Sequence, residues 1–132
     1  MKEFHLEIVT PDGLIFDENI ESLLVRTDDG DVEFLAGHID YMASLGTGKA
    51  RIKVGKEERL ASVSGGFITV TKGDVKLVAI TFEFADMIDL ERAKAARDKA
   101  TELLSTAKDA TSIELAKAKL QRALNRINVA EM

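Results

Sequence analysis

Three arginines in the last third of the chain, Arg92, Arg122 and Arg126, are the residues whose type and spacing point most directly to a ligand. Arg122 and Arg126 are four residues apart, so they share one face if the segment is helical. Guanidinium groups bind phosphate oxygens through paired hydrogen bonds, and Lys99, two helical turns after Arg92, adds a fourth cation. The set therefore predicts a polyanion site, against the alternative of an ordinary solvated helix face.

An acidic turn in the first half, formed by Asp28, Asp29 and Asp31, is the second candidate. Its spacing is wrong for a calcium-binding EF-hand, which also needs a closing glutamate. Two interpretations remain open: a solvated turn, or a docking point where the carboxylates orient a partner. The nearby Gly37 and His38 carry the same choice between a plain turn and a partner contact.

The remaining motif-like segments do not assemble an active site. The Gly-Lys pair at 48–49 is not a nucleotide phosphate loop, because Ala43 and Ala50 replace residues that such a loop requires. The only two histidines, His5 and His38, lie far apart in the sequence, which argues against a histidine-rich metal site. The chain has no cysteine, which excludes disulfides and thiol catalysis. We therefore expect a protein that is not an enzyme and holds no metal.

Composition places these residues in an acidic globular protein of 132 residues, with a net charge of −5, 45% hydrophobic and 31% charged residues. The acidic balance argues against nucleic acid as a partner. The longest run without a charged residue, 60–71, is too short to span a bilayer, and the first residues lack the apolar core of a signal peptide. We expect a cytoplasmic protein with no direct membrane insertion.

The chain changes character near residue 87. All nine glycines and the single proline, Pro11, precede residue 74. Residues 1–86 hold nine basic and sixteen acidic side chains, whereas residues 87–132 hold nine basic and seven acidic ones. Glycine and proline interrupt regular elements, so this boundary predicts two domains of different class, 1–86 and 87–132.

The first domain is predicted to be an antiparallel β-sandwich, because short runs rich in β-branched residues alternate with turn signals about every ten residues. The expected strands are residues 4–9, 14–17, 23–26, 32–35, 50–54, 60–63, 67–71 and 75–81. The Gly65-Gly66 pair between two of them permits a bulge or a close approach of strands. No helix longer than two turns is expected within residues 1–80.

The second domain is predicted to be an antiparallel two-helix hairpin, which makes the fold class α+β. Asp89 caps a first helix over 90–107, and Thr111 or Ser112 caps a second over 113–129. The connection is short, so the helices are antiparallel neighbours and the three arginines converge at one end. The apolar stripe of the first helix is mostly alanine, which buries little area and predicts weak docking to anything else.

Several segments of the chain resemble the epsilon subunit of bacterial F-type ATP synthase. Residues 63–67 match its V-S-G-G-F signature, and residues 88–93 match the I-D-x-x-R-A motif of its ATP-binding members. Residues 30–38 resemble its G-E-I-G-V-L-P-G-H loop, and residues 122–127 fit its last helix. The resemblance covers essentially the full chain, in order.

The loop departs from the family pattern at three positions. Glu33 stands where the family has a glycine, and Ala36 and Asp40 stand where it has prolines. Proline fixes φ and glycine frees it, so these departures bear on the contacts of residues 28–41 and not on the fold.

The resemblance implies a central-stalk rotor subunit that is not itself catalytic. It couples the catalytic head to the membrane rotor ring during ATP synthesis and proton or sodium transport, at the cytoplasmic face of the bacterial membrane. Its partners would be the gamma subunit, the c-subunit ring and, with the hairpin extended, the alpha and beta subunits. The alternative is a stand-alone β-sandwich interaction module with a helical tail and no nucleotide binding.

The resemblance also implies roles for individual residues. The domain 1–86 would dock on the rotor, and the hairpin 87–132 would inhibit ATP hydrolysis unless ATP, a regulatory ligand and not a substrate, is bound. The implied docking residues are Asp28, Asp29, Asp31, Gly37, His38 and Tyr41. The implied ATP-binding residues are Glu83, Ile88, Asp89, Arg92, Ala93, Lys99, Arg122 and Arg126, with no obligatory metal.

Overall fold

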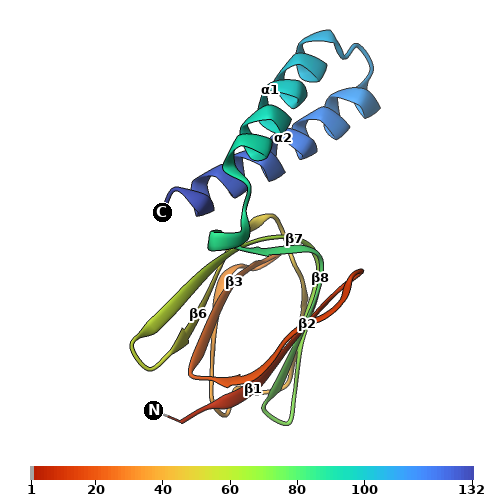
Figure 1. Cartoon of the computed structure of the whole chain (residues 1–132). Coiled ribbons are helices and arrows are strands. Elements are labelled where there is room, and N and C mark those ends of the chain that lie inside the picture. Colours follow the sequence, from red (N-terminus) through yellow and green to blue (C-terminus); the bar gives the residue numbers. More distant parts are fainter. Residues whose placement is uncertain (1) are drawn as a thin grey trace. The chain divides into compact units, whose positions relative to one another are not determined.

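The computed structural model describes residues 2–132 and divides into two compact units, one ending at Phe84 and the other formed by Ala85–Met132 (Figure 1). The first unit is built of strands and the second of helices. The predicted fold class, an α+β chain with an N-terminal sandwich and a C-terminal helical hairpin, is confirmed. Within residues 2–132, no helix is long and apolar enough to cross a membrane.

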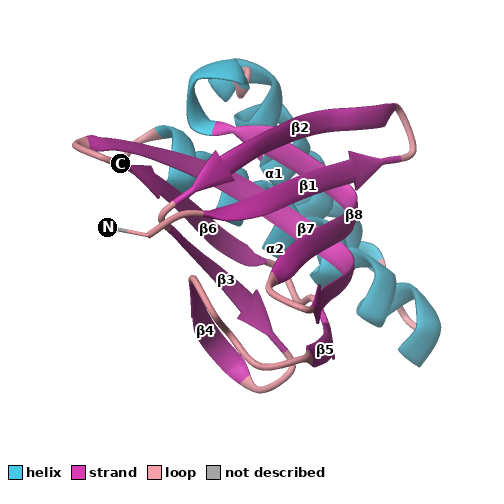
Figure 2. Ribbon diagram, turned by 90° about the horizontal axis from the view of Figure 1, so that it is seen from below, coloured by secondary structure: helices cyan, strands magenta, loops and turns pink. Residues whose placement is uncertain are grey.

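Eight strands form one continuous ladder that folds into a sandwich (Figure 2). They are β1 (Phe4–Thr10), β2 (Gly13–Ile20), β3 (Ser22–Thr27), β4 (Gly30–Leu35), β5 (Tyr41–Ser44), β6 (Gly48–Val54), β7 (Glu57–Thr71) and β8 (Asp74–Phe84). The order is β2-β1-β8-β7-β6-β3-β4, with β5 paired to β7. Among the described strands, β1 and β8 pair in parallel and the other pairs are antiparallel. β5 was not predicted, because its sequence YMAS contains no β-branched aliphatic residue and no proline or glycine turn signal stands directly beside it.

Alternation of side chains decides which face of each strand enters the core. In β1, Phe4, Leu6 and Ile8 are buried, whereas the intervening His5 and Glu7 are only partly buried and face outward. The same period of two governs β3 and most of β8. Buried side chains from β1 to β4 and from β6 to β8 thus join in a single hydrophobic core.

β7 is one strand of 15 residues, where the sequence analysis expected two strands, 60–63 and 67–71. Its first half pairs with β6 and its second half pairs with β5, so it connects the two layers of the sandwich. Gly65 and Gly66 lie between these halves with φ of +73° and +107°. A Cβ on Gly66 would lie 1.9 Å from the carbonyl oxygen of Val78. The close approach of strands that the glycine pair permits is therefore present, and the pair reshapes the strand without ending it.

The second unit contains the short helix η1 (Ala85–Met87) and the helices α1 (Leu90–Thr106) and α2 (Ala110–Ala130). Asp89 caps α1 as predicted, because its carboxylate accepts a hydrogen bond from the backbone N–H of Arg92 at 3.1 Å. α2 begins before the predicted residue 113, and its cap position is Asp109, not Thr111 or Ser112. The reason lies in the backbone: Asp109 is the last extended residue, with φ −100° and ψ 159°, before the helix starts.

Alanine dominates the contact between the two helices. Ala93 and Ala100 are buried on α1, and Ala116 and Ala123 are buried on α2 at the same spacing of seven. Alanine side chains let helix axes approach closely, but each buries little apolar area at about 25 cal/mol per Å². α2 also contacts η1, so the open end of the hairpin is closed by its own connecting segment.

The Gly66→Ala variant should lose about 3 kcal/mol of unfolding free energy, because the new Cβ meets the Val78 carbonyl and the backbone has positive φ. The Gly73→Ala variant is the matched control. Gly73 also has positive φ, at +84°, but its Cβ would meet nothing within 4 Å, so the loss should be about 1 kcal/mol. Urea unfolding measures both, and equal midpoints for the two variants would contradict the close approach at Gly66.

Candidate functional site

The acidic turn between β3 and β4 is held in one shape by a threonine at its base. Thr27 is buried, and its hydroxyl donates to the carbonyl of Gly30 at 3.0 Å. The same oxygen accepts the backbone N–H of Asp29 at 3.0 Å. The carboxylates at the tip therefore stand on an ordered turn, which lowers the entropy cost of presenting them to a partner.

The acidic turn and the loop before β5, which the sequence analysis treated as separate candidates, are joined in the structure. The Tyr41 hydroxyl donates to the Asp29 carboxylate at 2.8 Å. The backbone N–H of Asp28 donates to the carbonyl of Ser44, at the end of β5, at 3.0 Å. The structure thus brings the predicted docking residues Asp28, Asp29 and Tyr41 into one surface.

An aromatic cluster supports that surface from below. The buried Phe34 ring lies 4.9 Å from the His38 ring and 5.6 Å from the Tyr41 ring, and the latter two rings are 5.8 Å apart. The backbone N–H of His38 donates to the carbonyl of Leu35 at 3.2 Å. Gly37, the preceding residue, has φ +79° and turns the chain into this position. His38 is therefore a half-buried ring of a packed cluster and not a mobile loop side chain.

The negative charges of the turn are not equivalent. Asp31 forms an ion pair with Arg26 at 2.9 Å, between directly opposite residues of β3 and β4. Glu33, one of the departures from the family pattern, similarly pairs with Arg51 at 3.0 Å. Within residues 2–132, Asp28 forms no ion pair. The negative potential of the turn is therefore carried by Asp28 and Asp29, with Asp31 largely balanced.

Exposed apolar side chains border the acidic turn and continue along the outer face of the sheet. Ile39 and Met42, beside the turn, are 78% and 73% exposed. Cross-strand pairing aligns a row of outward-facing apolar residues, the outer apolar row: Leu14, Val9, Val78 and Phe67. Patches of this kind mark interaction surfaces. The sequence analysis missed the row, although Phe67 occupies an outward position of an alternating segment.

The three arginines of the polyanion prediction lie at one end of the hairpin. α1 and α2 run antiparallel, so Arg92 near the start of α1 is beside Arg122 and Arg126 near the end of α2. Each arginine directly precedes a buried residue of the hairpin: Ala93, Ala123 and Ile127.

The three arginines also share one flank of the hairpin. Each residue turns a helix by about 100°. Both helices are right-handed and they run antiparallel. The residues that directly precede the buried contact residues therefore lie on the same side of the hairpin in α1 and in α2. Arg92 and Arg122 are exposed on that flank, Arg126 is half-buried, and Lys99 is exposed two turns along α1.

Three of the other predicted ATP-binding residues lie at the start of the hairpin unit, and one lies in the sandwich unit. Asp89 is the helix cap, and Ala93 is fully buried, so packing and capping alone account for both. Ile88 is half-buried between η1 and α1. Glu83 lies on β8, in the sandwich unit. Within the hairpin unit, the structure therefore assembles the cations of the predicted site.

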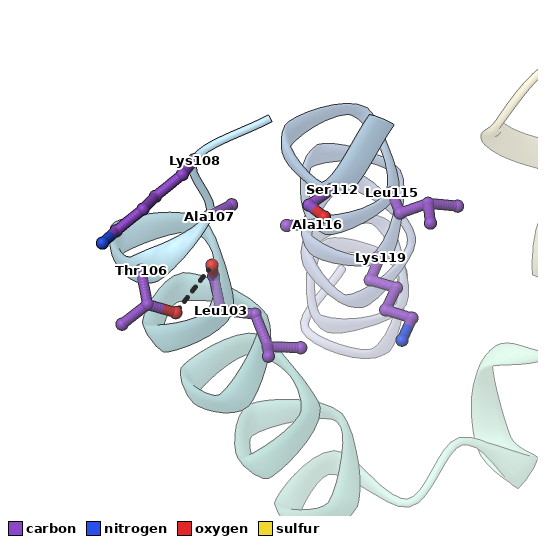
Figure 3. Close-up of a pocket in the computed structure, with 8 residues that line it drawn as sticks. All are labelled: Leu103, Thr106, Ala107, Lys108, Ser112, Leu115, Ala116 and Lys119. Atoms are coloured by element: carbon purple, nitrogen blue, oxygen red, sulfur yellow. Dashed lines mark hydrogen bonds between the residues drawn. The ribbon is translucent and has the colours of Figure 1, made fainter. Parts of the chain in front are cut away.

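An open groove of about 470 Å³, which was not predicted from the sequence, lies at the end of the hairpin where α1 connects to α2 (Figure 3). Its lining residues include the apolar Leu103 and Leu115 and the basic Lys108 and Lys119. The side chains of Lys108 and Leu115 point away from the space between the two helices (Figure 3). The Thr106 hydroxyl donates to the Leu103 carbonyl at 3.2 Å along one wall. Its lining residues sit near the helix connection, at the opposite end of the hairpin from the arginines.

The Tyr41 phenol is a direct probe of the contact that joins the acidic turn to the loop before β5, because the chain has one tyrosine and no tryptophan. The hydrogen bond to Asp29 and partial burial raise the pKa of Tyr41 above its ordinary value of 10.0. A raised folded-state pKa means that the contact stabilises the fold fully below pH 10 and is lost as pH rises through the folded-state pKa. Ultraviolet titration of the phenolate should show this high pKa.

The Asp29→Asn variant should shift the Tyr41 titration toward 10.0, since it removes the charge that opposes phenolate formation. The Asp31→Asn variant is the control, because Asp31 contacts Arg26 and not Tyr41. An unshifted titration in Asp29→Asn would mean that the turn and the loop are not joined through this contact.

Comparison with known proteins relates both units to one family. Residues 3–85 match the model described as ATP synthase, Delta/Epsilon chain, beta-sandwich domain, and residues 86–131 match the long alpha-helix domain of the same chain. The ATP synthase epsilon chains of Bacillus velezensis and Bacillus subtilis are 44% and 45% identical over 130 residues, covering 98% of both sequences in each case. A chain of the Euglena gracilis mitochondrial ATP synthase shares the fold, with a TM-score of 0.83 at 22% identity over 98% of this chain and 82% of that one.

Proposed function

The chain belongs to the ATP synthase delta/epsilon family, and its resemblance to the bacterial epsilon subunit is confirmed. On that premise we propose that the chain is a non-catalytic rotor subunit of the central stalk. The sandwich docks on the other rotor subunits, and the hairpin regulates ATP hydrolysis in response to ATP. The stand-alone interaction module is disfavoured, because both units match one chain of a single complex over nearly their whole length.

Docking on the membrane rotor ring is assigned to the acidic turn. Asp28 and Asp29 supply a negative potential on an ordered base, and the exposed Ile39 and Met42 beside them supply apolar area. Polar and basic loops of the ring would meet this surface with complementary charge, which sets orientation and association rate more than affinity. The ring is thereby coupled to the sandwich.

Docking on the gamma subunit is assigned to His38 and the outer apolar row. His38 is fixed by ring contacts with Phe34 and Tyr41. Phe67, at one end of the outer apolar row, is 43% exposed, and a solvent-exposed aromatic ring gains little unless a partner covers it. An aromatic residue at the centre of an interface is a usual anchor for binding energy.

ATP regulation is assigned to the arginine flank. The observation that carries this proposal is that Arg92, Arg122 and Arg126 meet at one end and on one flank of the hairpin. Guanidinium groups there would bind the phosphates of ATP, and the segment around Ile88 would line the base. Both histidines lie in the sandwich and the chain has no cysteine, so the hairpin offers neither as a base or nucleophile, and the nucleotide would leave intact.

The switch then follows from linkage. ATP binds the folded-down hairpin, the state in which the hairpin is not extended along the stalk. At a hundredfold excess over the dissociation constant, ATP stabilises this state by about 2.7 kcal/mol. A difference of that size changes a two-state ratio about a hundredfold. Without ATP, the hairpin extends along the stalk toward the alpha and beta subunits and inhibits hydrolysis. The alanine-based contact of α1 with α2 would cost little to open as the hairpin extends, because each alanine buries little apolar area.

Removal of either Arg92 or Arg126, as alanine variants, should weaken ATP binding by about 1.5–3 kcal/mol, the usual contribution of a hydrogen bond to a charged group. Isothermal titration calorimetry on the full chain measures this. The Arg97→Ala variant is the matched control, since Arg97 lies on the same helix but pairs with Asp98 at 3.0 Å. Absence of ATP binding to the unsubstituted chain at millimolar nucleotide would refute the regulatory proposal.

The Asp28→Lys variant should weaken assembly with the isolated rotor ring about tenfold at low salt, and the loss should shrink as salt is raised. Asp28 forms no ion pair within residues 2–132, so its reversal breaks no internal contact of that kind. The Glu58→Lys variant is the control, because Glu58 is the second residue of β7, near the Ser22 end of β3 and away from the acidic turn. Equal ring binding by both variants at low salt would show that the turn is only solvated.

A further inference from the structure

A cluster of metal-ligating side chains lies on the outer face of β1 and β2, strands that take no part in the acidic turn between β3 and β4. Glu7 of β1 is directly opposite Asp17 of β2, and His5 is directly opposite Asn19. Phe4, Leu6 and Ile8 occupy the alternate, buried positions of β1, so His5 and Glu7 point away from the core. Their partners on β2 lie on the same outer face.

The geometry of the cluster is close to that of a coordination site. The His5 Nε2 atom lies 2.5 Å from the Asp17 Oδ1 atom. One ligand atom each from His5, Glu7 and Asp17 lies within 4.8 Å of the others. Two ligand atoms that each lie about 2.0–2.2 Å from one zinc ion are roughly 3.5 Å apart. Side-chain rotations that shift the three ligand atoms by about 1 Å would therefore bring them to coordination distance. The two-strand ladder holds the three Cα atoms in place for that adjustment.

An independent observation concerns the far side of the imidazole. The His5 Nδ1 atom lies 3.1 Å from the Asn19 Oδ1 atom, so Nδ1–H can donate to this amide oxygen. In the metal-free chain, the Nε2 contact with Asp17 is an ion pair in which Nε2–H donates to the carboxylate. A metal ion would displace that proton, and Nδ1–H would remain the imidazole's donor to Asn19. A carbonyl acceptor behind a histidine is the usual support for a metal-bound imidazole. Asn19 is therefore placed as the orienting partner of His5.

From this arrangement we propose that His5 Nε2 and the carboxylates of Glu7 and Asp17 form a surface site for a divalent transition-metal ion, of which Zn²⁺ is the representative. One imidazole with two carboxylates favours zinc-like ions over magnesium and calcium, which prefer all-oxygen sites. The site is partly exposed, which leaves a coordination position for water. The prediction of no metal considered only the distance between the two histidines and did not consider carboxylates from a neighbouring strand.

The site would tie down the end of the ladder. β2 pairs with β1 alone along the strand order, and a metal bridging His5 and Glu7 to Asp17 would cross-link the two strands. Lys76 opposes it: its Nζ atom lies 3.8 Å from the Glu7 carboxylate. Removal of that ammonium group should therefore strengthen metal binding, whereas loss of the imidazole should abolish it.

The test is calorimetric titration of the full chain with zinc chloride alone, in a buffer that does not chelate it. We expect one saturable zinc per chain, lost in the His5→Gln variant and at least tenfold weaker in Asp17→Asn. Binding should be unchanged in His38→Gln, which removes the only other histidine, and tighter in Lys76→Gln. Circular dichroism confirms that each variant is folded.

Three outcomes would overturn the proposal: no saturable binding up to about 1 mM zinc, a threshold that still detects weak sites; unchanged binding in a folded His5→Gln variant; or loss of binding in His38→Gln. None of these outcomes involves ATP, the arginines or the rotor ring, so the metal site and the proposed function can fail independently.

Discussion

The contact between α1 and α2 depends on alanine, and this constraint shapes the behaviour of the whole chain. Ala93, Ala100, Ala116 and Ala123 bring the helices close while burying little apolar surface. The two helices are therefore held together by a small buried area, while Leu103, Leu115 and Leu124 of the hairpin are exposed. Under the proposed function, a bound anion that contributes a few kcal/mol would be enough to favour one position of the hairpin. The arginine flank lies on the same two helices, so ATP bound there, as proposed, would link ligand binding to the position of the hairpin.

The sandwich has the opposite character. β7 runs through both layers, and the fully buried Phe34 anchors the rings of His38 and Tyr41. Hydrogen bonds order its candidate docking surface. The Thr27 hydroxyl bonds to the backbone at both sides of the acidic turn, and the Tyr41 hydroxyl joins that turn to the loop before β5. Under the proposed function, the ordered sandwich would provide a fixed attachment and the alanine-packed hairpin a reversible response.

Local signals in the sequence predicted the elements well, and long-range partners set the limits. Asp89 was predicted as a helix cap because capping depends on neighbouring residues alone. The Gly65-Gly66 pair was predicted to lie between two strands and to permit a bulge or a close approach, and pairing with β8 on both sides holds it inside one strand. The balance of Asp31 by Arg26 depends on the register of β3 with β4, which the sequence does not display. Convergence of the arginines was predictable, since a short connection forces antiparallel helices.

The position of the hairpin with and without ATP is the most direct measure of the central claim. The chain has no native cysteine, so Lys56→Cys in the β6–β7 turn and Lys108→Cys in the hairpin connection would carry the only two spin labels. Pulsed electron paramagnetic resonance then gives the distribution of distances between them. The account predicts one narrow distribution with saturating ATP and a shifted, broader one without it. Identical distributions with and without ATP would contradict it.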